Sequence, residues 1–338
     1  MPKLKKKEIV LEYQNYILQP PFSPKDLKTN VARFDDATIT KWQNQWISQT
    51  AANKEKFGSF EELSVSRFWG KGKYKPAIIA GSGPSLKNNG HELGDRGDIP
   101  LMSCLHNYHY FHDNKIKVDF YLSLDAGEIT ISEIAEGGEA PEEEYWESTK
   151  DNKLLCWIGT HPKLLEKWKG EIYFFNHVMP DTVVKNKLRD IEKFNLLFSA
   201  GGNVLGACLY FAKAIYGANP VAFVGADFAF GYEKKFHPWD SQYDKDIGIC
   251  HHSFDIFGNR VLTWPSYYGF KCFFDYVAIT IPGFYVNCSE GGTLGSYPEG
   301  NLMQIKQMDL CDFYAMYNQS DELKRAYESA PEQDVILY

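Results

Sequence analysis

Short apolar runs alternate with longer polar or helix-periodic stretches through the middle of the chain, and this alternation predicts the fold class. Each run is only a few residues long and is bounded by turn-forming residues, as expected for strands buried on both faces of a sheet. The stretches between the runs are long enough for crossover helices. We therefore predict an α/β, Rossmann-like fold, with a mostly parallel sheet and helices on both faces. The expected strands lie at residues 78–79, 101–104, 118–124, 154–158, 172–175, 221–225 and 285–288.

The same pattern suggests three parts along the chain. Residues 1–72 are predicted to be a helical N-terminal segment, with Trp42, Trp46 and Ile47 on one helix face. Residues 73–308 form the predicted catalytic domain, and residues 309–338 a C-terminal helical tail. Within the domain, an acidic stretch at about 133–147 is interpreted as an exposed insertion or lid, and a solvated face is the preferred interpretation of its glutamates. Further expected elements are a helix at 204–216, a polar loop at 234–249, a strand at 259–264 and a helix at 267–281.

Composition and charge narrow the class of protein. A net charge of −8 argues against a protein that coats nucleic acid, and the apolar runs are too short to cross a bilayer. We expect no signal peptide. The seven cysteines contain no C-x-x-C pair, so we read them as reduced thiols of a cytoplasmic protein. Cys250, His251 and His252 come closest to a metal cluster, and a surface loop is the preferred interpretation there.

A glycine loop directly after the first expected strand is the main candidate for chemistry. It contains Gly81, Ser82, Gly83, Pro84 and Ser85, and a helix is predicted to begin at its end. Glycines let the backbone approach a ligand closely, and free N–H groups at a helix start favour a phosphate. A tight turn without a ligand is an equally good interpretation, since a lone glycine loop is a weak signal. Pro84 and Ser85 do not fit a dinucleotide fingerprint.

Several landmarks agree, in the same order, with one known family. Residues 78–86 resemble the G-x-GPSL loop of the 6-hydroxymethylpterin pyrophosphokinase (MptE)-like family, which includes the core domain of motility-associated factor (Maf) flagellin glycosyltransferases. The resemblance covers roughly residues 60–300. The other matching elements are residues 123–125, 201–204, 225–229, 258–263 and 287–292, and His237 lies about where that group has a histidine.

A more distant likeness is to bacterial sialyltransferases that use a CMP-activated sugar. Their strand and following Gly-Asn-Gly-Pro-Ser-Leu loop are similar to residues 78–86, and their Cys-Asn-x-Phe-Tyr-Phe element is similar to residues 104–111. Archaeal pterin pyrophosphokinases carry a T-D-L-D-G strand end, of which residues 123–127 keep only part, and an H-G-D-N element that this sequence lacks. This departure favours the glycosyltransferase branch of the lineage.

Polar residues after the expected strands supply the remaining candidates for binding. Asn107 is expected to bind the nucleotide or sugar, or alternatively to be a turn residue. Asp125 and Asp227 each follow a buried strand, where an unpaired carboxylate is costly, so each is expected to bind a metal, a ribose or a substrate hydroxyl. A helix-capping role is the alternative for both. Gly201, Gly202 and Asn203 open a second helix suited to a carboxylate or phosphate, or Asn203 is a plain N-cap.

The candidate catalytic residues are Asp227 and His237. His237 has a side chain whose ordinary pKa suits a general base, although a loop histidine without a task is an equal alternative. The resemblance also implies that Thr263, Glu290 and Gly291 contact substrate.

Three functions follow from these residues. The first is a nucleotide-dependent glycosyltransferase that moves a nonulosonic (sialic-like) acid from CMP to a glycan or protein acceptor. The second is a 6-hydroxymethyl-dihydropterin pyrophosphokinase, which uses ATP and would need Mg²⁺ held by carboxylates such as Asp125 and Asp227. The third is a non-catalytic binding module on the same fold. The first function requires no resident cofactor or metal.

Overall fold

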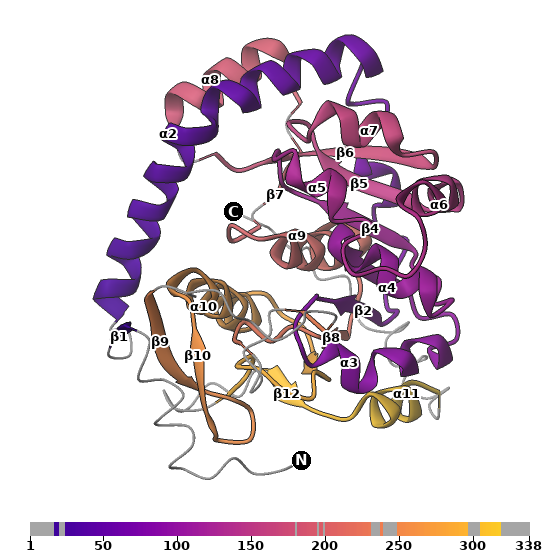
Figure 1. Ribbon diagram of the computed structural model, residues 1–338, viewed down its shortest axis with the longest axis vertical. Coiled ribbons are helices and arrows are strands. Elements are labelled where there is room, and N and C mark those ends of the chain that lie inside the picture. Colours follow the sequence, from indigo (N-terminus) through magenta and orange to yellow (C-terminus); the bar gives the residue numbers. More distant parts are fainter. Residues whose placement is uncertain are drawn as a thin grey trace.

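The fold is centred on a parallel sheet, which Figure 1 shows surrounded by helices. The computed structural model describes residues 17–19, 24–179, 181–194, 196–198, 200–230, 237–238, 249–296 and 305–318. Among these residues the sheet has nine strands, and every neighbouring pair in it is parallel. In sheet order the strands are β12 (Ile305–Gln307), β11 (Tyr285–Asn287), β8 (Val221–Val224), β2 (Ala77–Ala80), β3 (Leu101–Cys104), β4 (Phe120–Ser123), β5 (Lys153–Trp157), β6 (Glu171–His177) and β7 (Leu197–Phe198).

The order of the strands places a topological switch beside β2. From β2 the chain adds β3 to β7 in one direction, and it then returns to place β8, β11 and β12 on the other side of β2. Ile79 therefore pairs with Met102 of β3 on one side and with Phe223 of β8 on the other. In sheets of this kind, ligands bind beyond the carboxyl ends of the strands at the switch. The loops that follow β2 and β8 lie at that point.

The predicted fold class is confirmed, and so are the seven strands predicted for this sheet. Each predicted apolar run contains or overlaps an observed strand, and the central strands β2, β3, β4 and β8 are buried along their whole length. Two further strands of the sheet, β7 and β12, were not predicted. They are two and three residues long, too short for a periodicity to register.

A separate three-stranded sheet lies outside the main one. It consists of β1 (Ile17–Gln19), β9 (Ile249–Phe254) and β10 (Arg260–Thr263), with β9 parallel to β1 and antiparallel to β10. The strand predicted at 259–264 is β10. The interpretation of residues 250–252 as a surface loop is wrong, because Cys250 and His251 are buried in β9. Most of the polar loop predicted at 234–249 lies outside the described residues.

Helices occupy the connections between the strands. α9 packs across β2, β3 and β4 and continues as a π-helical turn over Phe211–Tyr216, so the helix predicted at 204–216 is present. The helix predicted at 267–281 is α10. No described helix has the length and apolarity that a bilayer crossing requires. The helices are α2 (Pro24–Phe57), α3 (Leu86–Asn89), α4 (Tyr108–Asp113), α5 (Ile129–Ser132), α6 (Glu142–Ser148), α7 (Pro162–Lys167), α8 (Thr182–Ile191), α9 (Val204–Tyr210), α10 (Pro265–Thr280) and α11 (Leu310–Asn318).

The long helix α2 is fastened to the carboxyl edge of the sheet by side-chain amides. Gln45 and Gln49 donate hydrogen bonds to the Ala126 carbonyl just beyond β4, at 3.0 and 3.1 Å. Asn53 donates to the carbonyls of Ile158 and Thr160 beyond β5, at 2.9 and 2.8 Å. The helix also packs against α7, α8 and α10, and Figure 1 shows it extending from the top of the molecule to β1.

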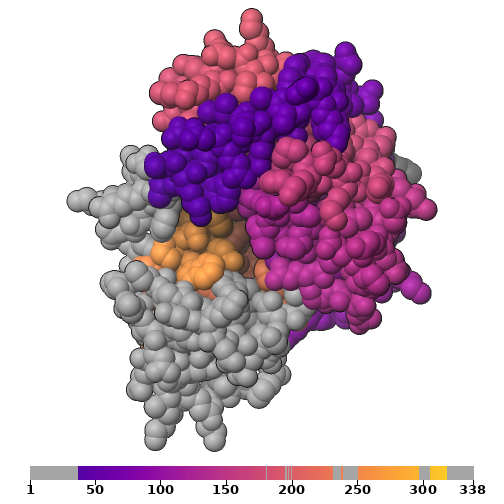
Figure 2. All heavy atoms as spheres, turned by 45° about the horizontal axis from the view of Figure 1, so that its top comes forward, coloured from indigo at the N-terminus to yellow at the C-terminus, as the bar shows by residue number. Residues whose placement is uncertain are grey.

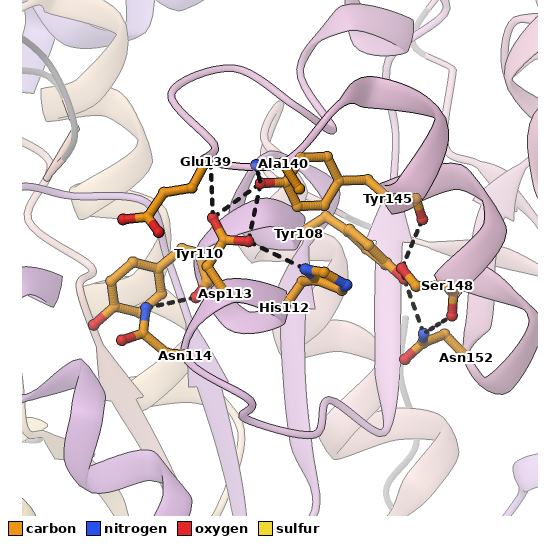
Figure 3. A network of polar contacts seen from close by, with 10 residues as sticks. All are labelled: Tyr108, Tyr110, His112, Asp113, Asn114, Glu139, Ala140, Tyr145, Ser148 and Asn152. Atoms are coloured by element: carbon orange, nitrogen blue, oxygen red, sulfur yellow. Dashed lines mark hydrogen bonds and ion pairs between the residues drawn. The ribbon is translucent and has the colours of Figure 1, made fainter.

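The acidic insertion at 133–147 is anchored to the body of the protein, as the polar network in Figure 3 shows. Tyr145 is fully buried, and its hydroxyl donates to the Asp113 carboxylate at the end of α4, 2.9 Å from each oxygen. The Ala140 amide donates to the Tyr145 hydroxyl at 2.9 Å, and the Glu139 amide donates to Asp113 at 3.2 Å. The glutamates at 139, 143 and 144 are exposed as predicted, but this segment is packed on α4 rather than projecting as a solvated lid.

Candidate functional site

Three loops meet at the switch point, and their polar groups bond to one another. We call residues 81–85, 225–227 and 289–293 the glycine seam. The Gly81 amide donates to the Val224 carbonyl and the Gly83 amide donates to the Gly225 carbonyl, both at 2.8 Å. The Ser85 amide donates to one oxygen of the Asp227 carboxylate at 2.8 Å, and the Ser85 hydroxyl donates to the other.

Glycines make this close contact between loops possible. A Cβ on Gly83 would lie 2.6 Å from both Asp227 Cγ and the Gly225 oxygen, closer than atoms can approach without displacing the chain. A Cβ on Gly81 would lie 2.5 Å from the Gly225 oxygen. Gly292 has φ +75°, and a Cβ there would lie 2.2 Å from Asp227 Cα. These glycines let one loop approach another loop, whereas the sequence suggested that they let the backbone approach a phosphate.

Asp227 is the centre of the seam. Its side chain is 5 % exposed, and burial raises its pKa to about 6 while the two bonds from Ser85 oppose that shift. The Thr293 amide donates to the Asp227 carbonyl at 2.7 Å, which fixes the backbone as well. Asp227 therefore has protein donors on both carboxylate oxygens, and its assignment as a catalytic residue stays a prediction.

A second group of polar side chains lies beside the seam, next to the end of β3. We call His106, His109, His237, Glu133 and Glu136 the histidine cluster. The His237 Nδ1 lies 2.9 Å from the Ser82 carbonyl oxygen, and the rings of His237 and His106 have centroids 4.2 Å apart. The His106 Nε2 lies 3.2 Å from the Glu136 carboxylate. A histidine more than 150 residues away in sequence is thereby brought against the glycine loop.

Burial sets the charge of the cluster. It lowers the pKa of His106 to about 3, with His237 and His109 adding to the effect, and it lowers the pKa of His109 to about 4. Both rings are therefore neutral at neutral pH, so the contact of His106 with Glu136 is not an ion pair there. Burial, with Asp125 and Glu136 nearby, raises the pKa of Glu133 to about 7. At neutral pH, Glu133 is therefore the member of the cluster that burial brings close to a change of protonation.

Asn107 lies beneath the cluster and is fully buried. Its Nδ2 donates to the Ser103 hydroxyl at 2.9 Å and to the Ala80 carbonyl at 3.3 Å, which ties the end of β3 to the end of β2. Its Oδ1 is buried without a hydrogen-bond partner. Cys104, also at the end of β3, is kept as a thiol because burial raises its pKa to about 11, despite a bond with Ser82.

Asp125 departs from its predicted setting. It was expected to be a buried carboxylate at a strand end, but β4 ends at Ser123 and the Asp125 side chain is exposed. Its Oδ1 accepts a hydrogen bond from the Gly127 amide at 2.7 Å, which is an ordinary turn contact. The burial argument for a ligand at Asp125 therefore does not hold. Across the described stretches of the chain, no three His, Cys, Asp or Glu side chains are grouped so as to hold a metal ion.

The other predicted residues lie around the seam in packing or capping positions. Asn203 is the N-cap of α9, and its Oδ1 accepts from the Gly206 amide at 2.9 Å. Gly201 and Gly202 have positive φ, and a Cβ on Gly201 would meet the Phe273 ring of α10 at 2.3 Å. The Thr263 hydroxyl donates to the Phe228 carbonyl at 2.7 Å.

Two of the predicted residues come from the loop after β11. Gly291 is within the seam, where a Cβ would lie 3.2 Å from Ser85 Cβ. Glu290 is partly buried, and burial together with Glu92 and Asp309 raises its pKa. Their assignment as substrate-binding residues stays a prediction.

The sequence pattern missed four members of the histidine cluster, namely His106, His109, Glu133 and Glu136. His106 lies two residues beyond β3, at the same strand end that drew attention to Asn107. The two glutamates were interpreted as part of a solvated face. The sequence could have pointed to His106 alone, by its position after a strand. The other three reach the site through tertiary packing, which the hydrophobic pattern of the sequence does not predict.

Comparisons with known proteins agree with this architecture. A family model described as 6-hydroxymethylpterin diphosphokinase MptE-like matches residues 45–233, more than half of the chain. No curated protein matches the chain. Among solved structures, the chain is similar to the MAf glycosyltransferase from Magnetospirillum magneticum AMB-1, with a TM-score of 0.52 and 14% sequence identity. The match covers 79% of this chain and 42% of that protein, so this chain spans less than half of its length, and at that identity the likeness concerns the fold.

Proposed function

The chain belongs to the 6-hydroxymethylpterin diphosphokinase MptE-like family, and we propose that it is a nucleotide-dependent transferase of the glycosyltransferase kind. Its donor would be a CMP-activated nonulosonic (sialic-like) acid, and its acceptor a hydroxyl group of a glycan or protein. The fold that it shares with a MAf glycosyltransferase makes this activity a candidate, and the geometry of His237 supports it.

The observation that carries the proposal is the contact of His237 Nδ1 with the Ser82 carbonyl at 2.9 Å. A carbonyl oxygen only accepts, so Nδ1 carries the proton and donates it. In the neutral ring, Nε2 is then the nitrogen whose lone pair a general base uses. The contact fixes this tautomer at the carboxyl edge of β2, where the family loop would hold the leaving phosphate.

The transfer requires little beyond this base. The acceptor hydroxyl gives its proton to His237 Nε2 as its oxygen attacks the anomeric carbon of the donor. The bond from that carbon to the phosphate oxygen breaks, and CMP leaves with the electron pair. The imidazolium formed on His237 lies against the ring of His106, which stays neutral and so places no positive charge beside it.

Ser82 is the residue of the glycine loop best suited to the leaving phosphate. Gly81, Gly83, Ser85 and Leu86 all donate their amides within the protein, and Pro84 has no N–H. Within the described residues, Ser82 therefore has the one amide of this loop with no acceptor in the chain. It follows the end of β2, directly before the carbonyl contact with His237, so donor and base would meet at this residue.

The family description favours a second candidate, a pterin diphosphokinase that uses ATP and Mg²⁺. The metal would need carboxylates such as Asp125 and Asp227. Asp125 is exposed and accepts from the Gly127 amide, whereas Asp227 is buried and accepts from Ser85 on both oxygens. These two carboxylates are in different settings and do not fit a shared Mg²⁺ site. We therefore derive no step through a metal.

A thermal-shift panel of nucleotides tests the proposal. CMP or CDP without metal should stabilise the protein by about 2.7 kcal/mol when present at about 100 times the dissociation constant. Stabilisation by ATP only with Mg²⁺ would instead support the diphosphokinase. A flat response to every nucleotide would refute both and leave a non-catalytic binding module on this fold.

A further inference from the structure

A cavity lined by polar and apolar side chains lies at the carboxyl end of β6, away from the glycine seam. It has a volume of about 60 Å³, is partly open to solvent, and lies between the end of β6 and α8. Figure 2 shows α8 standing beside α2 at the top of the molecule. In the order of the sheet, β6 is four strands from β2, a separation of about 19 Å at the usual strand spacing. The residues that matter here are His177, Met179, Lys185, Leu188, Arg189 and Phe194.

Two cations line this cavity without a counter-charge. Lys185 and Arg189 are four residues apart, on the same face of α8, and both are exposed. In the part of the chain that the structure describes, neither forms an ion pair, whereas many of the surface lysines elsewhere are paired with glutamates. An ammonium and a guanidinium placed together are suited to a carboxylate or phosphate.

His177 adds an acceptor that is unsatisfied. Its Nε2 is buried and has no hydrogen-bond partner, although buried polar atoms are nearly always paired. Burial lowers the pKa of this ring to about 4, although a hydrogen bond with the backbone at Val178 acts in the opposite direction. The ring is therefore neutral at neutral pH. The backbone hydrogen bond favours the protonated ring, so a ring N–H donates to the backbone, and we assign that donor to Nδ1. Nε2 then carries a lone pair to which no group donates.

Met179, Leu188 and Phe194 supply an apolar wall beside these polar groups. A ligand that satisfies the whole set has an anionic group, a hydroxyl and a carbon frame between them. We propose that this cavity binds a hydroxylated oxyanion, either a sugar phosphate or a sugar acid, with Lys185 and Arg189 on the anionic group and His177 Nε2 accepting from a hydroxyl. The site uses no residue of the seam or of the histidine cluster, and it does not depend on the function proposed above.

Isothermal titration calorimetry on the full chain tests the site with four probes, namely glucose 6-phosphate, glucuronate, glucose and inorganic phosphate. Glucose 6-phosphate or glucuronate should bind, and the tighter of the two identifies the anionic group. Glucose should not bind measurably. If neither anion binds, or if glucose binds equally well, the proposal is wrong. Equal affinity for glucose 6-phosphate and inorganic phosphate would overturn the hydroxyl contact to His177.

Substitutions on α8 locate the binding. Lys185→Gln and Arg189→Gln should each weaken binding of the preferred anion about tenfold, the effect expected when one charge-assisted contact is lost. Lys187→Gln is the matched control, because Lys187 is an exposed lysine on the same helix that does not line the cavity. All three positions are exposed, so folding should be unchanged. An equal loss in the control would mean general attraction to a basic helix and would overturn the site.

Discussion

The glycine seam and the histidine cluster lie side by side at one edge of the sheet, yet their polar groups are used in opposite ways. In the seam, amides, hydroxyls and the Asp227 carboxylate bond to one another, and a Cβ at Gly81, Gly83 or Gly292 would collide with the facing chain. In the cluster, the ring of His237 lies against that of His106, and burial keeps His106 and His109 neutral while it raises the pKa of Glu133 to about 7. The contrast indicates that the seam fixes the shape of the site, while the cluster supplies neutral rings and the titratable carboxyl group of Glu133.

The largest effect should come from breaking the cluster. His237→Gln removes the proposed base but keeps a side chain of similar length, so release of CMP from a CMP-nonulosonate in the presence of acceptor should slow by at least about 100-fold. CMP should still raise the unfolding temperature of the variant, because the phosphate contacts remain. His161→Gln, at the N-cap of α7 and outside the seam and the cluster, is the control. A variant that turns over at the wild-type rate would remove His237 from the mechanism.

The next effect should come from overpacking the seam. Gly83→Ala puts a Cβ 2.6 Å from Asp227 Cγ, so the loops must separate, and the free energy of unfolding should fall by about 3 kcal/mol. If the loop only approached a phosphate, a side chain at Gly83 would instead leave the fold intact. Gly94→Ala is the matched control, since a Cβ there meets nothing within 4 Å. Urea denaturation measures both, and equal midpoints would show that the seam tolerates a Cβ.

Asp227 should make the seam sensitive to pH. Its folded pKa of about 6 lies above the ordinary value of 3.8, so the folded state holds this proton more tightly. The stability gained from the proton is therefore present below about pH 4 and is lost as the pH rises through about 6. Asp227→Asn should lack this loss. The difference in unfolding free energy between wild type and variant should fall by about 2–3 kcal/mol from pH 4 to pH 7.

Urea titrations of both proteins at several pH values measure that difference. Asp190→Asn, at an exposed position on α8 outside the seam and the histidine cluster, serves as the control and should keep the wild-type loss of stability between pH 4 and pH 7. A constant difference between wild type and Asp227→Asn would show that Asp227 keeps the same protonation in the folded and unfolded chain.

The smallest effect should come from loosening the anchor of the acidic segment, which carries Glu133 and Glu136 to the cluster. Tyr145→Phe removes the bond to Asp113 and leaves the Ala140 amide without its acceptor, so unfolding should become easier by about 1–2 kcal/mol. Tyr173→Phe is the control, because that hydroxyl bonds to the exposed Glu171 side chain. Equal effects of the two substitutions would mean that the network in Figure 3 adds nothing specific.

The fold was predictable because short segments of the sequence are enough to identify its strands and helices. Four-residue apolar runs such as Ile78–Ile79 with their neighbours can hardly be anything but buried strands, and the alternation with helices leads to a parallel sheet. The positions of the loops after the strands follow from that sheet. The very short strands β7 and β12 could not be predicted, since two or three residues show no period.

The site was predictable only in part, because its bonds join distant segments. The sequence singled out Ser85 and Asp227 separately, but not that they bond to each other across 142 positions. It singled out His237, but not the ring of His106 against it. Asp125 was misjudged because β4 ends at Ser123, one residue before the end of the apolar run, and Asp125 lies in the exposed turn beyond it. Partners of this kind depend on which strands become neighbours, and that is decided by packing over the whole chain.

The side-chain amides of α2 limit where a ligand can bind along the carboxyl edge of the sheet. The carbonyls beyond β4 and β5 already accept hydrogen bonds from Gln45, Gln49 and Asn53. This stretch of the edge is therefore covered by α2. The covered stretch lies between the seam at β2 and β8 and the cavity at the end of β6. If both proposed sites bind, each ligand should therefore leave the affinity for the other unchanged.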